Sequence, residues 1–173
     1  MLKLPLLFLA LLLAGCTPRH FYTGPTDGPI ATLQAQATIY EDRNGESLRE
    51  SYMPTGIDGK TLRFNWKSAA IDGQYHLPPG PHKILVRASL RRGNLWDGST
   101  KYFSVIEANF VANRHYLVNG APRFADNRLD LWIEDSETGA RVSDSPSLDL
   151  SNPVQPPTVV TYPIYVPVVK GVR

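Results

Sequence analysis

Residues 82–91 read His-Lys-Ile-Leu-Val-Arg-Ala-Ser-Leu-Arg, and their side chains alternate between two faces. A period of two is the geometry of a β-strand that packs one face on a hydrophobic core. The preceding Pro78-Pro79-Gly80-Pro81 is typical of a turn at a strand end, because proline has no N–H to leave unpaired. The stretch therefore predicts a strand whose inner face carries His82, Ile84, Val86, Ala88 and Leu90.

The same alternation recurs along the chain on both sides of this strand. Turn residues separate the segments, as at Asn44-Gly45, at 55–60 and in the hairpin 136–139, and no segment has the pattern of a four-turn helix. We therefore predict an all-β fold, a single antiparallel β-sandwich of Ig-like or transthyretin-like type over residues 30–149. The expected strands are 30–40, 47–53, 61–66, 82–91, 101–112, 115–119 and 128–134, with a return of the hairpin through 141–143.

The first fifteen residues have the pattern of a cleavable export signal. Lys3 supplies a positive charge, and the apolar run from Leu4 to Leu13 is too short to cross a bilayer. Leu13, Ala14, Gly15 and Cys16 close the run, and this Leu-Ala-Gly-Cys sequence resembles the lipobox of bacterial lipoproteins. The resemblance implies cleavage before Cys16, diacylglyceryl transfer to its sulfur and acylation of the new amino group.

Cys16 is the only cysteine, so the chain can form no internal disulfide. Lipidation gives this thiol a role, and several acyl chains anchor a protein stably. The alternative is an ordinary secretory signal with an incidental cysteine. Thr17 stands where inner-membrane lipoproteins often have aspartate, so the resemblance favours the outer membrane, facing the periplasm. Residues 16–29 are expected to form the lipidated N-terminus and a tether.

The segment from Leu77 to Val86 resembles the Leu-x-Pro-Gly-x-His-x-Ile-x-Val stretch of PEGA-type domains. These are small β-sandwich modules of envelope lipoproteins, and the resemblance covers residues 57–92. The extra proline of Pro78-Pro79-Gly80-Pro81 departs from the usual pattern. The resemblance implies an accessory binding or scaffolding role and carries over no binding residue.

The ionisable residues provide little support for an enzyme. None of His76, His82 and His115 is two residues from another ligand-type side chain, and the motifs of common hydrolases and metal sites are absent from the sequence. We therefore predict no catalytic residue, no metal ligand and no cofactor, with His82 as a hydrogen-bonded turn residue. The alternative is an envelope hydrolase whose site is assembled from separated loops.

The densest acidic group occurs between residues 126 and 137, without the spacing of a calcium-binding loop. Asp130 and Glu134 share a strand face with Trp132, which favours a solvated face over a metal site. The members of the acidic group are Asp126, Asp130, Glu134, Asp135 and Glu137.

Candidate partner contacts fall in two places within the predicted domain. Lys83, Arg87 and Arg91 form a basic stripe on one strand face, which could contact anionic envelope material, either lipid headgroups or cell-wall carboxylates. The alternative is cross-strand pairing with acidic neighbours. Trp96 lies at the tip of a polar hairpin loop, where it could bind a partner or fold back on the sandwich.

Residues 150–173 form a proline-rich tail that carries no charge as far as Val169. Its five prolines exclude a membrane-spanning helix. Tyr162 and Tyr165 are available for docking, either on the protein's own sheet or on an envelope protein partner. The net charge of +2 provides no strong positive field, so nucleic acid is not an expected partner. The sequence thus predicts a lipid-anchored binding, scaffolding or accessory module.

Overall fold

The computed structural model describes residues 22–25, 27–41, 47–62, 74–92 and 99–153. Their secondary structure is almost entirely β, with one short 3-10 helix, η2, at Phe124–Asp126. The strands are β1 (Ala31–Gln34), β2 (Gln36–Glu41), β3 (Ser47–Ile57), β4 (Lys60–Thr61), β5 (Gln74–Leu77), β6 (Gly80–Arg92), β7 (Thr100–Phe110), β8 (His115–Arg123), β9 (Arg128–Asp135) and β10 (Ser147–Asp149).

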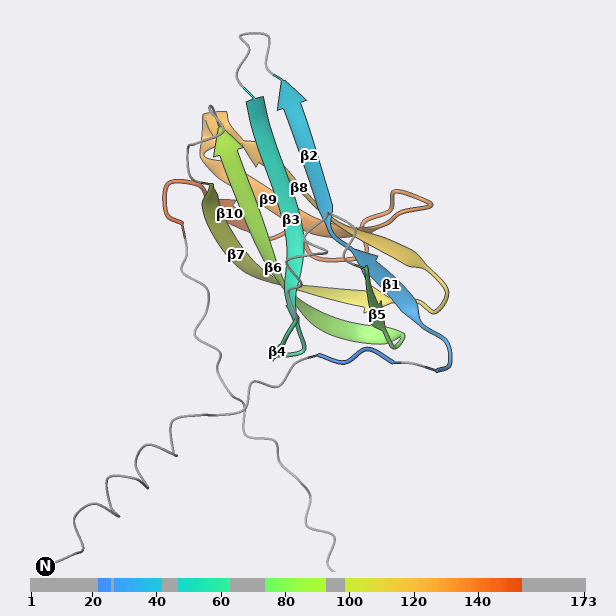
Figure 1. Ribbon diagram of the computed structural model, residues 1–173. Helices are drawn as coiled ribbons and strands as arrows, with labels where there is room; N and C mark the ends of the chain where they lie inside the picture. The colour runs from blue at the N-terminus through green and yellow to red at the C-terminus, as the bar shows by residue number, and fades with distance from the viewer. Residues whose placement is uncertain (1–21, 26, 42–46, 63–73, 93–98, 154–173) are drawn as a thin grey trace, which may run out of the picture.

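Two sheets pack face to face, which confirms the predicted β-sandwich (Figure 1). Sheet A has the order β2-β3-β6-β7, with β4 paired to β3, and sheet B has the order β10-β9-β8-β1-β5. Every pair of neighbouring strands is antiparallel except β1 and β8, which are parallel. Within the described residues, no helix is long and apolar enough to span a bilayer.

The predicted inner face of β6 is the centre of the core. Ile84, Val86 and Ala88 have no exposed surface, and Leu90 is also buried. The apolar side chains of β7 and of three sheet B strands complete the core, because burying them is the main favourable contribution to folding. They include Leu33, Tyr102, Ile106, Phe110, Tyr116, Val118, Leu129, Leu131 and Ile133.

The single strand predicted over residues 30–40 is instead two strands that belong to different sheets. β1 lies in sheet B and β2 in sheet A, and the chain crosses between the sheets at Ala35. Gln36 is in register with the buried Tyr52, so Gln36 takes the inner side of sheet A and Ala37 the outer side. The alternation in the sequence continues across a change of sheet and therefore did not show the break.

β3 is longer than the predicted 47–53 strand and runs through Pro54 to Ile57. The pairing of β3 with β6 shifts between Pro54 and Gly56, which is a β-bulge that accommodates a proline inside a strand. Asp58 and Gly59 both have positive φ angles, 50° and 75°, as in the two-residue turns that match the twist of hairpin strands. This turn connects β3 to β4.

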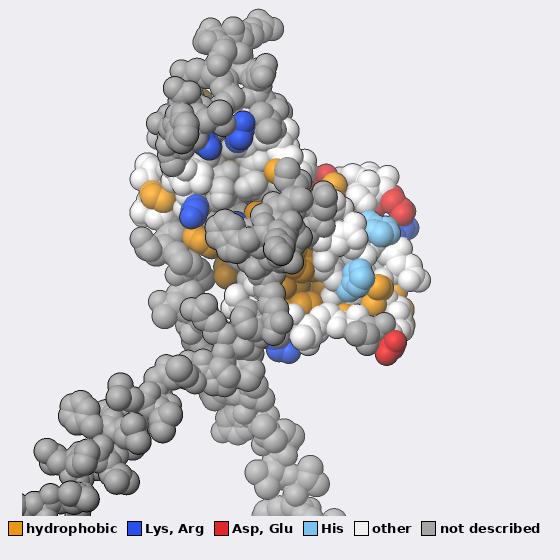
Figure 2. Space-filling model, in the orientation of Figure 1, with side chains coloured by type: hydrophobic (Ala, Val, Ile, Leu, Met, Phe, Trp, Pro, Cys, Tyr) orange, Lys and Arg blue, Asp and Glu red, His pale blue; other side chains and the backbone are white. Residues whose placement is uncertain are grey.

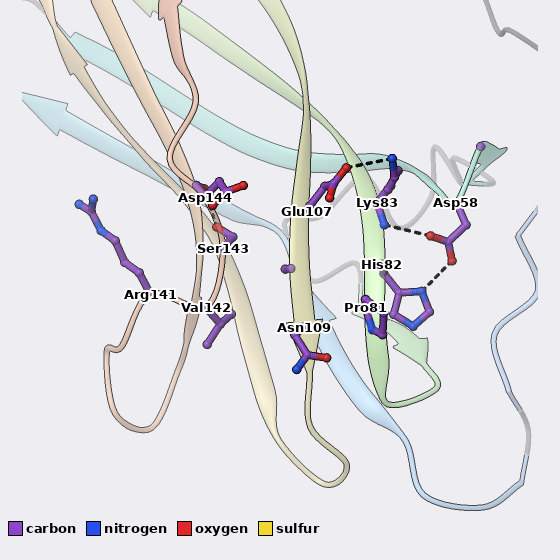
Figure 3. A pocket seen from close by; sticks show the side chains of 12 residues that line it. Asp58, Pro81, His82, Lys83, Glu107, Asn109, Arg141, Val142, Ser143 and Asp144 are labelled. Carbon is purple, nitrogen blue, oxygen red and sulfur yellow. Dashed lines mark hydrogen bonds and ion pairs between the residues drawn. The ribbon is translucent and has the colours of Figure 1, made fainter.

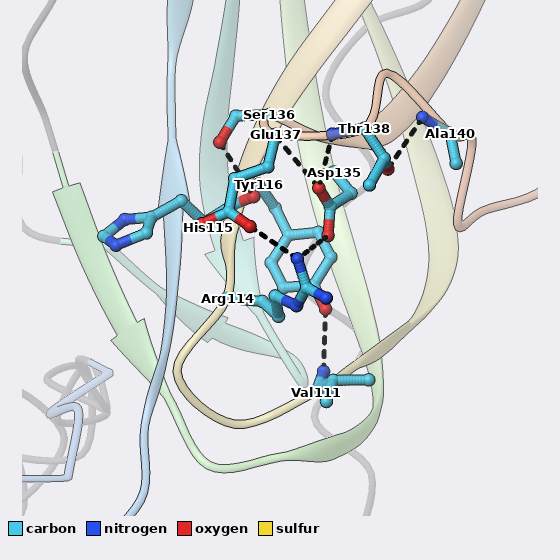
Figure 4. Close-up of polar contacts among 9 residues, drawn as sticks. All are labelled: Val111, Arg114, His115, Tyr116, Asp135, Ser136, Glu137, Thr138 and Ala140. Atoms are coloured by element: carbon cyan, nitrogen blue, oxygen red, sulfur yellow. Dashed lines mark hydrogen bonds and ion pairs between the residues drawn. The ribbon is translucent and has the colours of Figure 1, made fainter.

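The connection from β7 to β8 crosses from sheet A to sheet B and is fixed by Tyr116 (Figure 4). The Tyr116 hydroxyl accepts a hydrogen bond from the backbone N–H of Val111 at 2.8 Å, and its ring packs edge-on against Phe110. A tyrosine that binds the backbone a few residues upstream is the tyrosine corner of immunoglobulin-like sandwiches. This contact fixes one end of the sandwich.

The predicted tether already contacts the domain at Tyr22. Its N–H donates to the carbonyl of Thr61 at 3.0 Å, its hydroxyl donates to the carbonyl of His76 at 2.8 Å, and its ring packs against the core. A β-carbon at Gly24 would lie 2.5 Å from that same His76 carbonyl oxygen, so glycine permits this close approach. The predicted tether therefore extends too far along the chain, because Tyr22 belongs to the folded unit.

Candidate binding surface and groove

Lys83, Arg87 and Arg91 lie on the outer face of sheet A, as the alternation along β6 predicted. Their neighbours Ile84, Val86, Ala88 and Leu90 are buried, so the odd-numbered side chains of this strand point away from the core. Figure 2 shows Lys and Arg side chains gathered mainly on the upper half of the molecule on this side. The three predicted basic residues therefore share one face but have different surroundings.

Lys83 makes the cross-strand ion pair that was the alternative to a binding role. Its Nζ lies 2.9 Å from the carboxylate of Glu107, directly opposite on β7, and both side chains are about two-thirds exposed. An exposed pair of this kind contributes about 0–1 kcal/mol to stability. Lys83 is therefore a weak candidate for partner contact.

Arg87 is half-buried in the middle of the same face. The register places it between Met53 of β3 and Phe103 of β7, and one guanidinium nitrogen lies 3.3 Å from the Met53 sulfur. The charge of Arg87 also lowers the pKa of Tyr75, although burial is the larger effect and raises that pKa overall. The apolar stem of Arg87 therefore packs on the sheet, as is common for arginine.

Arg91 lies directly opposite Arg49 of β3. Two like charges in adjacent register positions disfavour each other and attract anions. Toward the start of β6 on the same face, Leu85 is half-buried, and Val105, opposite it on β7, is 50% exposed. The outer face of sheet A thus has a basic end, formed by Arg49 and Arg91, next to an apolar middle.

A buried carboxyl group lies on the inner side of the basic end. Glu50 follows Arg49 on β3, is only 4% exposed, and accepts a hydrogen bond from the Tyr52 hydroxyl at 2.7 Å. Burial raises the pKa of Glu50, and the Tyr52 hydrogen bond lowers it by less. Glu50 therefore holds its proton to a higher pH in the folded protein than a solvent-exposed glutamate does.

An open groove of about 900 Å³ lies at the other end of the same face (Figure 3). It runs between the β3–β4 turn, the start of β6, the end of β7 and the segment 141–144. Its polar lining is of mixed charge, which favours no single ligand charge. The lining residues are Asp58, Gly59, Pro81, His82, Lys83, Glu107, Ala108, Asn109, Arg141, Val142, Ser143 and Asp144.

His82 is the hydrogen-bonded turn residue that the sequence predicted. Its side chain is 9% exposed, with Nδ1 2.6 Å from Asp58 Oδ2 and Nε2 2.9 Å from the carbonyl oxygen of Pro78. The other Asp58 oxygen accepts the backbone N–H of Lys83 at 2.9 Å. Because both partners of the ring are acceptors, only the doubly protonated imidazole can donate to both at once. His82 and Asp58 thus join the β3–β4 turn to the β5–β6 turn.

These contacts leave no ring nitrogen of His82 to activate a nucleophile. The Ser143 hydroxyl in the same groove accepts the N–H of Ile133 at 2.7 Å and donates to the carbonyl of Asp144 at 2.8 Å. A serine hydrolase needs its histidine hydrogen-bonded to the serine hydroxyl. The described part of the groove therefore has no such constellation.

Two further histidines of the described residues lie on sheet B, away from His82. His76 of β5 and His115 of β8 are both exposed and both are in register with Thr32, on opposite sides of β1. Two strand spacings separate them, roughly 10 Å. Among the residues that the structure describes, no group of three or more His, Cys, Asp or Glu side chains could hold a metal ion.

The acidic group near β9 divides into separate structural contacts. Asp126 and Asp130 both pair with Arg123, whereas Asp135 and Glu137 pair with Arg114 (Figure 4). Glu134 accepts a hydrogen bond from the indole of Trp132 at 2.6 Å. These carboxylates point to different partners and do not converge on one ion.

Hydrogen bonds keep two of these carboxylates ionised. A hydrogen bond from Ser147, followed by Arg123, lowers the pKa of Asp130, and the backbone N–H of Thr138 lowers the pKa of Asp135. Asp135 accepts N–H groups from the turn that follows β9, so it holds the hairpin 136–139 in place. The acidic group is therefore part of the fold.

Trp132 was expected on a solvated face and is in fact 8% exposed. It lies on the outer side of sheet B, where the guanidinium of Arg141 stacks 4.1 Å from the ring centroid. The sequence did not indicate this cation–π contact, because the two residues meet only through the return of the chain along β9.

Several predicted site residues lie outside the described residues. They are the lipobox residues Leu13, Ala14, Gly15 and Cys16, the hairpin residue Trp96, and the tail residues Tyr162 and Tyr165. The strands that flank Trp96, β6 and β7, end and begin at the basic end of sheet A.

Comparisons with known proteins give no match: no family model, no curated protein and no solved structure is similar to this chain.

Proposed function

We propose that this chain is a lipid-anchored bacterial envelope protein whose sandwich is a binding or scaffolding module. The observation that carries the proposal is the Leu-Ala-Gly-Cys sequence at residues 13–16, with Cys16 as the only cysteine of the chain. The sequence preceding Cys16 fits an export signal. Acylation of Cys16 would fix the module to a bilayer, with the outer membrane favoured by Thr17.

The position of Tyr22 limits the distance between the anchor and the module. Tyr22 is six residue steps along the chain from Cys16, and an extended chain covers at most about 3.3–3.6 Å per step, so the connection reaches roughly 20 Å. Tyr22 contacts β4 and β5, at the lower end of the sandwich in Figure 1. The anchored protein therefore stands with this end toward the membrane.

The basic end of sheet A is at the opposite end of the sandwich. Lys83 lies near the start of β6 and Arg91 near its end, and eight residues of strand span roughly 26 Å. Arg49 and Arg91 are thus directed away from the anchoring bilayer. This arrangement supports carboxylates of the cell wall as the ligand rather than the headgroups of that bilayer.

The side chains of His82 and Ser143 already hydrogen-bond to other groups of the fold, which favours a binding role over hydrolysis. Both residues line the groove, yet each is occupied by contacts that fix the backbone. We therefore assign the groove no catalytic role.

Co-sedimentation of the purified full chain with isolated cell-wall sacculi tests this assignment. Arg49→Glu should weaken binding several-fold, because it removes one positive charge of the basic end and adds a negative one. Lys60→Glu is the matched control, since Lys60 is also exposed and lies on β4 at the other end of the sandwich. Equal binding by both variants, at equal thermal stability, would overturn the assigned surface.

A further inference from the structure

Within the described residues, the outer edge of β7 is incompletely paired. β7 is the last strand of sheet A, and among the described residues its outer edge carries one isolated bridge, between Ala108 and Ser143. The stretch from Thr100 to Glu107 has the β-rich sequence TKYFSVIE and contains no proline. Such an edge readily accepts another strand.

The register shows which backbone groups of β7 face this outer edge. The carbonyl of Lys83 accepts the N–H of Asp58, so odd-numbered residues of β6 turn their backbone groups toward β3. Even-numbered residues of β6 therefore face β7, where Ile84 is opposite Ile106. It follows that the odd-numbered residues of β7, among them Phe103 and Val105, point their N–H and C=O groups outward.

An apolar strip lies beside this edge. The chain from Arg141 to Asp149 runs along β9, antiparallel to it, and closes the flank of the sandwich next to β7. The strip consists of three partly buried apolar side chains that pack against the core, Val142, Leu148 and Leu150. A strand added to β7 would cover them.

The C-terminal segment leaves the described structure at the upper end of this strip. The Tyr102 hydroxyl donates to the carbonyl of Leu150 at 2.9 Å, which places Leu150 next to the start of β7. The chain then turns, since both Ser151 and Asn152 hydrogen-bond back to Asp149 (Figure 1). Residues 143–150 run antiparallel to β7, so a reversal here would send the following residues parallel to it.

The tail has the sequence expected of an edge strand. Pro157, Pro163 and Pro167 are all odd-numbered, so in an extended chain their missing N–H groups fall on one side. From Thr158 to Val166 the other side keeps every N–H, because it belongs to the even-numbered residues. Proline is tolerated in edge strands when its nitrogen faces solvent. The even-numbered residues are Thr158, Val160, Tyr162, Ile164 and Val166.

We infer that residues 158–166 of the same chain pair with the outer edge of β7 as a parallel fifth strand of sheet A. In a strand of L-residues, the side to which a residue's N–H points fixes the face on which its side chain lies. If this strand runs parallel to β7 and points its even-numbered N–H groups toward β7, its even-numbered side chains therefore face the core. Tyr162 and Ile164 then cover the apolar strip, whereas Tyr165 faces outward. Attachment through only a few residues favours the cis strand over a second copy.

Hydrogen exchange of the full chain tests the pairing at the amides of Phe103 and Val105. Ile164→Pro removes an N–H that faces β7 and should speed exchange at both amides by about tenfold or more. Tyr165→Pro is the matched control, because it removes an N–H that faces solvent and should leave the exchange unchanged. Both variants keep the complete sandwich core, so folding is not at issue.

Four results would overturn the inference. Rapid exchange at both amides in the unmodified chain means that no strand covers the edge. An equal effect of the two proline variants means that the tail does not pair through its even-numbered residues. Protection that grows with protein concentration assigns the edge to a second copy, and protection that requires added envelope extract assigns it to a partner.

Discussion

The two ends of sheet A use their polar side chains differently. At the lower end, His82, Asp58 and Tyr116 bind backbone groups or each other and connect separate turns. At the upper end, Arg49 and Arg91 stand side by side on the outer face. Polar residues beside a groove can be wholly structural, whereas two arginines in adjacent register positions attract anions.

The largest expected effect is a loss of stability, and it distinguishes the inner face of β6 from its outer face at the lower end. Ile84 is fully buried, so Ile84→Ala should lower the free energy of unfolding by about 2–5 kcal/mol. Leu85→Ala changes the next residue, which is half-buried on the outer face, and should cost clearly less. Denaturant unfolding measures both. Similar losses would mean that both faces of β6 are core.

Removing the Tyr116 hydroxyl from the tyrosine corner should give the next largest loss of stability. Tyr116→Phe removes the acceptor for the Val111 N–H and should cost about 1–3 kcal/mol. Tyr22→Phe is the comparison variant at the same end of the sandwich. It removes a more exposed hydrogen bond, so it should reduce the free energy of unfolding by less. Thermal unfolding of the two variants measures the difference, and an equal cost contradicts the role of the corner.

The contact between His82 and Asp58 should be worth about 1 kcal/mol, because Asp58 is 43% exposed. A double-mutant cycle with His82→Ala and Asp58→Asn measures the coupling energy directly. Coupling near zero would show that the two turns are held by other contacts. In that case His82 would be available for a role in the groove.

The buried carboxyl group of Glu50, at the upper end, should make the stability of the fold depend on pH. Its folded pKa is raised above 4.5, so the neutral form stabilises the fold at low pH and this contribution is lost as pH rises through the folded pKa. Asp130 and Asp135 act oppositely, since their lowered pKa values give stability that is lost only as pH falls below about 3.8.

Unfolding measured between pH 2 and pH 8 separates these contributions. Glu50→Gln should flatten the decline in stability on the alkaline side of pH 4.5 and leave the acid limb unchanged. An unaltered profile would show that folding does not raise the pKa of Glu50.

The exposed pair of Lys83 and Glu107 should have the smallest effect. Lys83→Ala should change the free energy of unfolding by at most about 1 kcal/mol, with a weaker effect in high salt. Titration with salt in the unmodified chain and the variant measures this. A larger loss would place Lys83 among the structural residues of the lower end.

The sequence predicted those elements whose signal is local. Alternation along residues 82–91 predicted the β6 face, and the turn residues at 136–139 predicted the hairpin after β9. The change of sheet at Ala35 was missed, because a strand alternates in the same way in either sheet. The length of β3 was also missed, since a proline normally ends a strand and here lies in a bulge.

The site was less predictable than the fold, because its contacts join residues far apart in the chain. His82 was expected in a turn, but its partner Asp58 lies 24 residues away. Arg49 was not among the candidates, because only the register of β3 with β6 places it opposite Arg91. A hydrophobic pattern specifies which side faces the core and leaves the register between strands open.

The central claim is most directly tested by the mass of the N-terminal peptide of the protein extracted from bacterial envelopes with detergent. The account predicts that this peptide begins at Cys16 and carries a diacylglyceryl group on sulfur and an acyl group on nitrogen. An unmodified thiol at Cys16, or a peptide that begins elsewhere in a protein free of the membrane fraction, would contradict it.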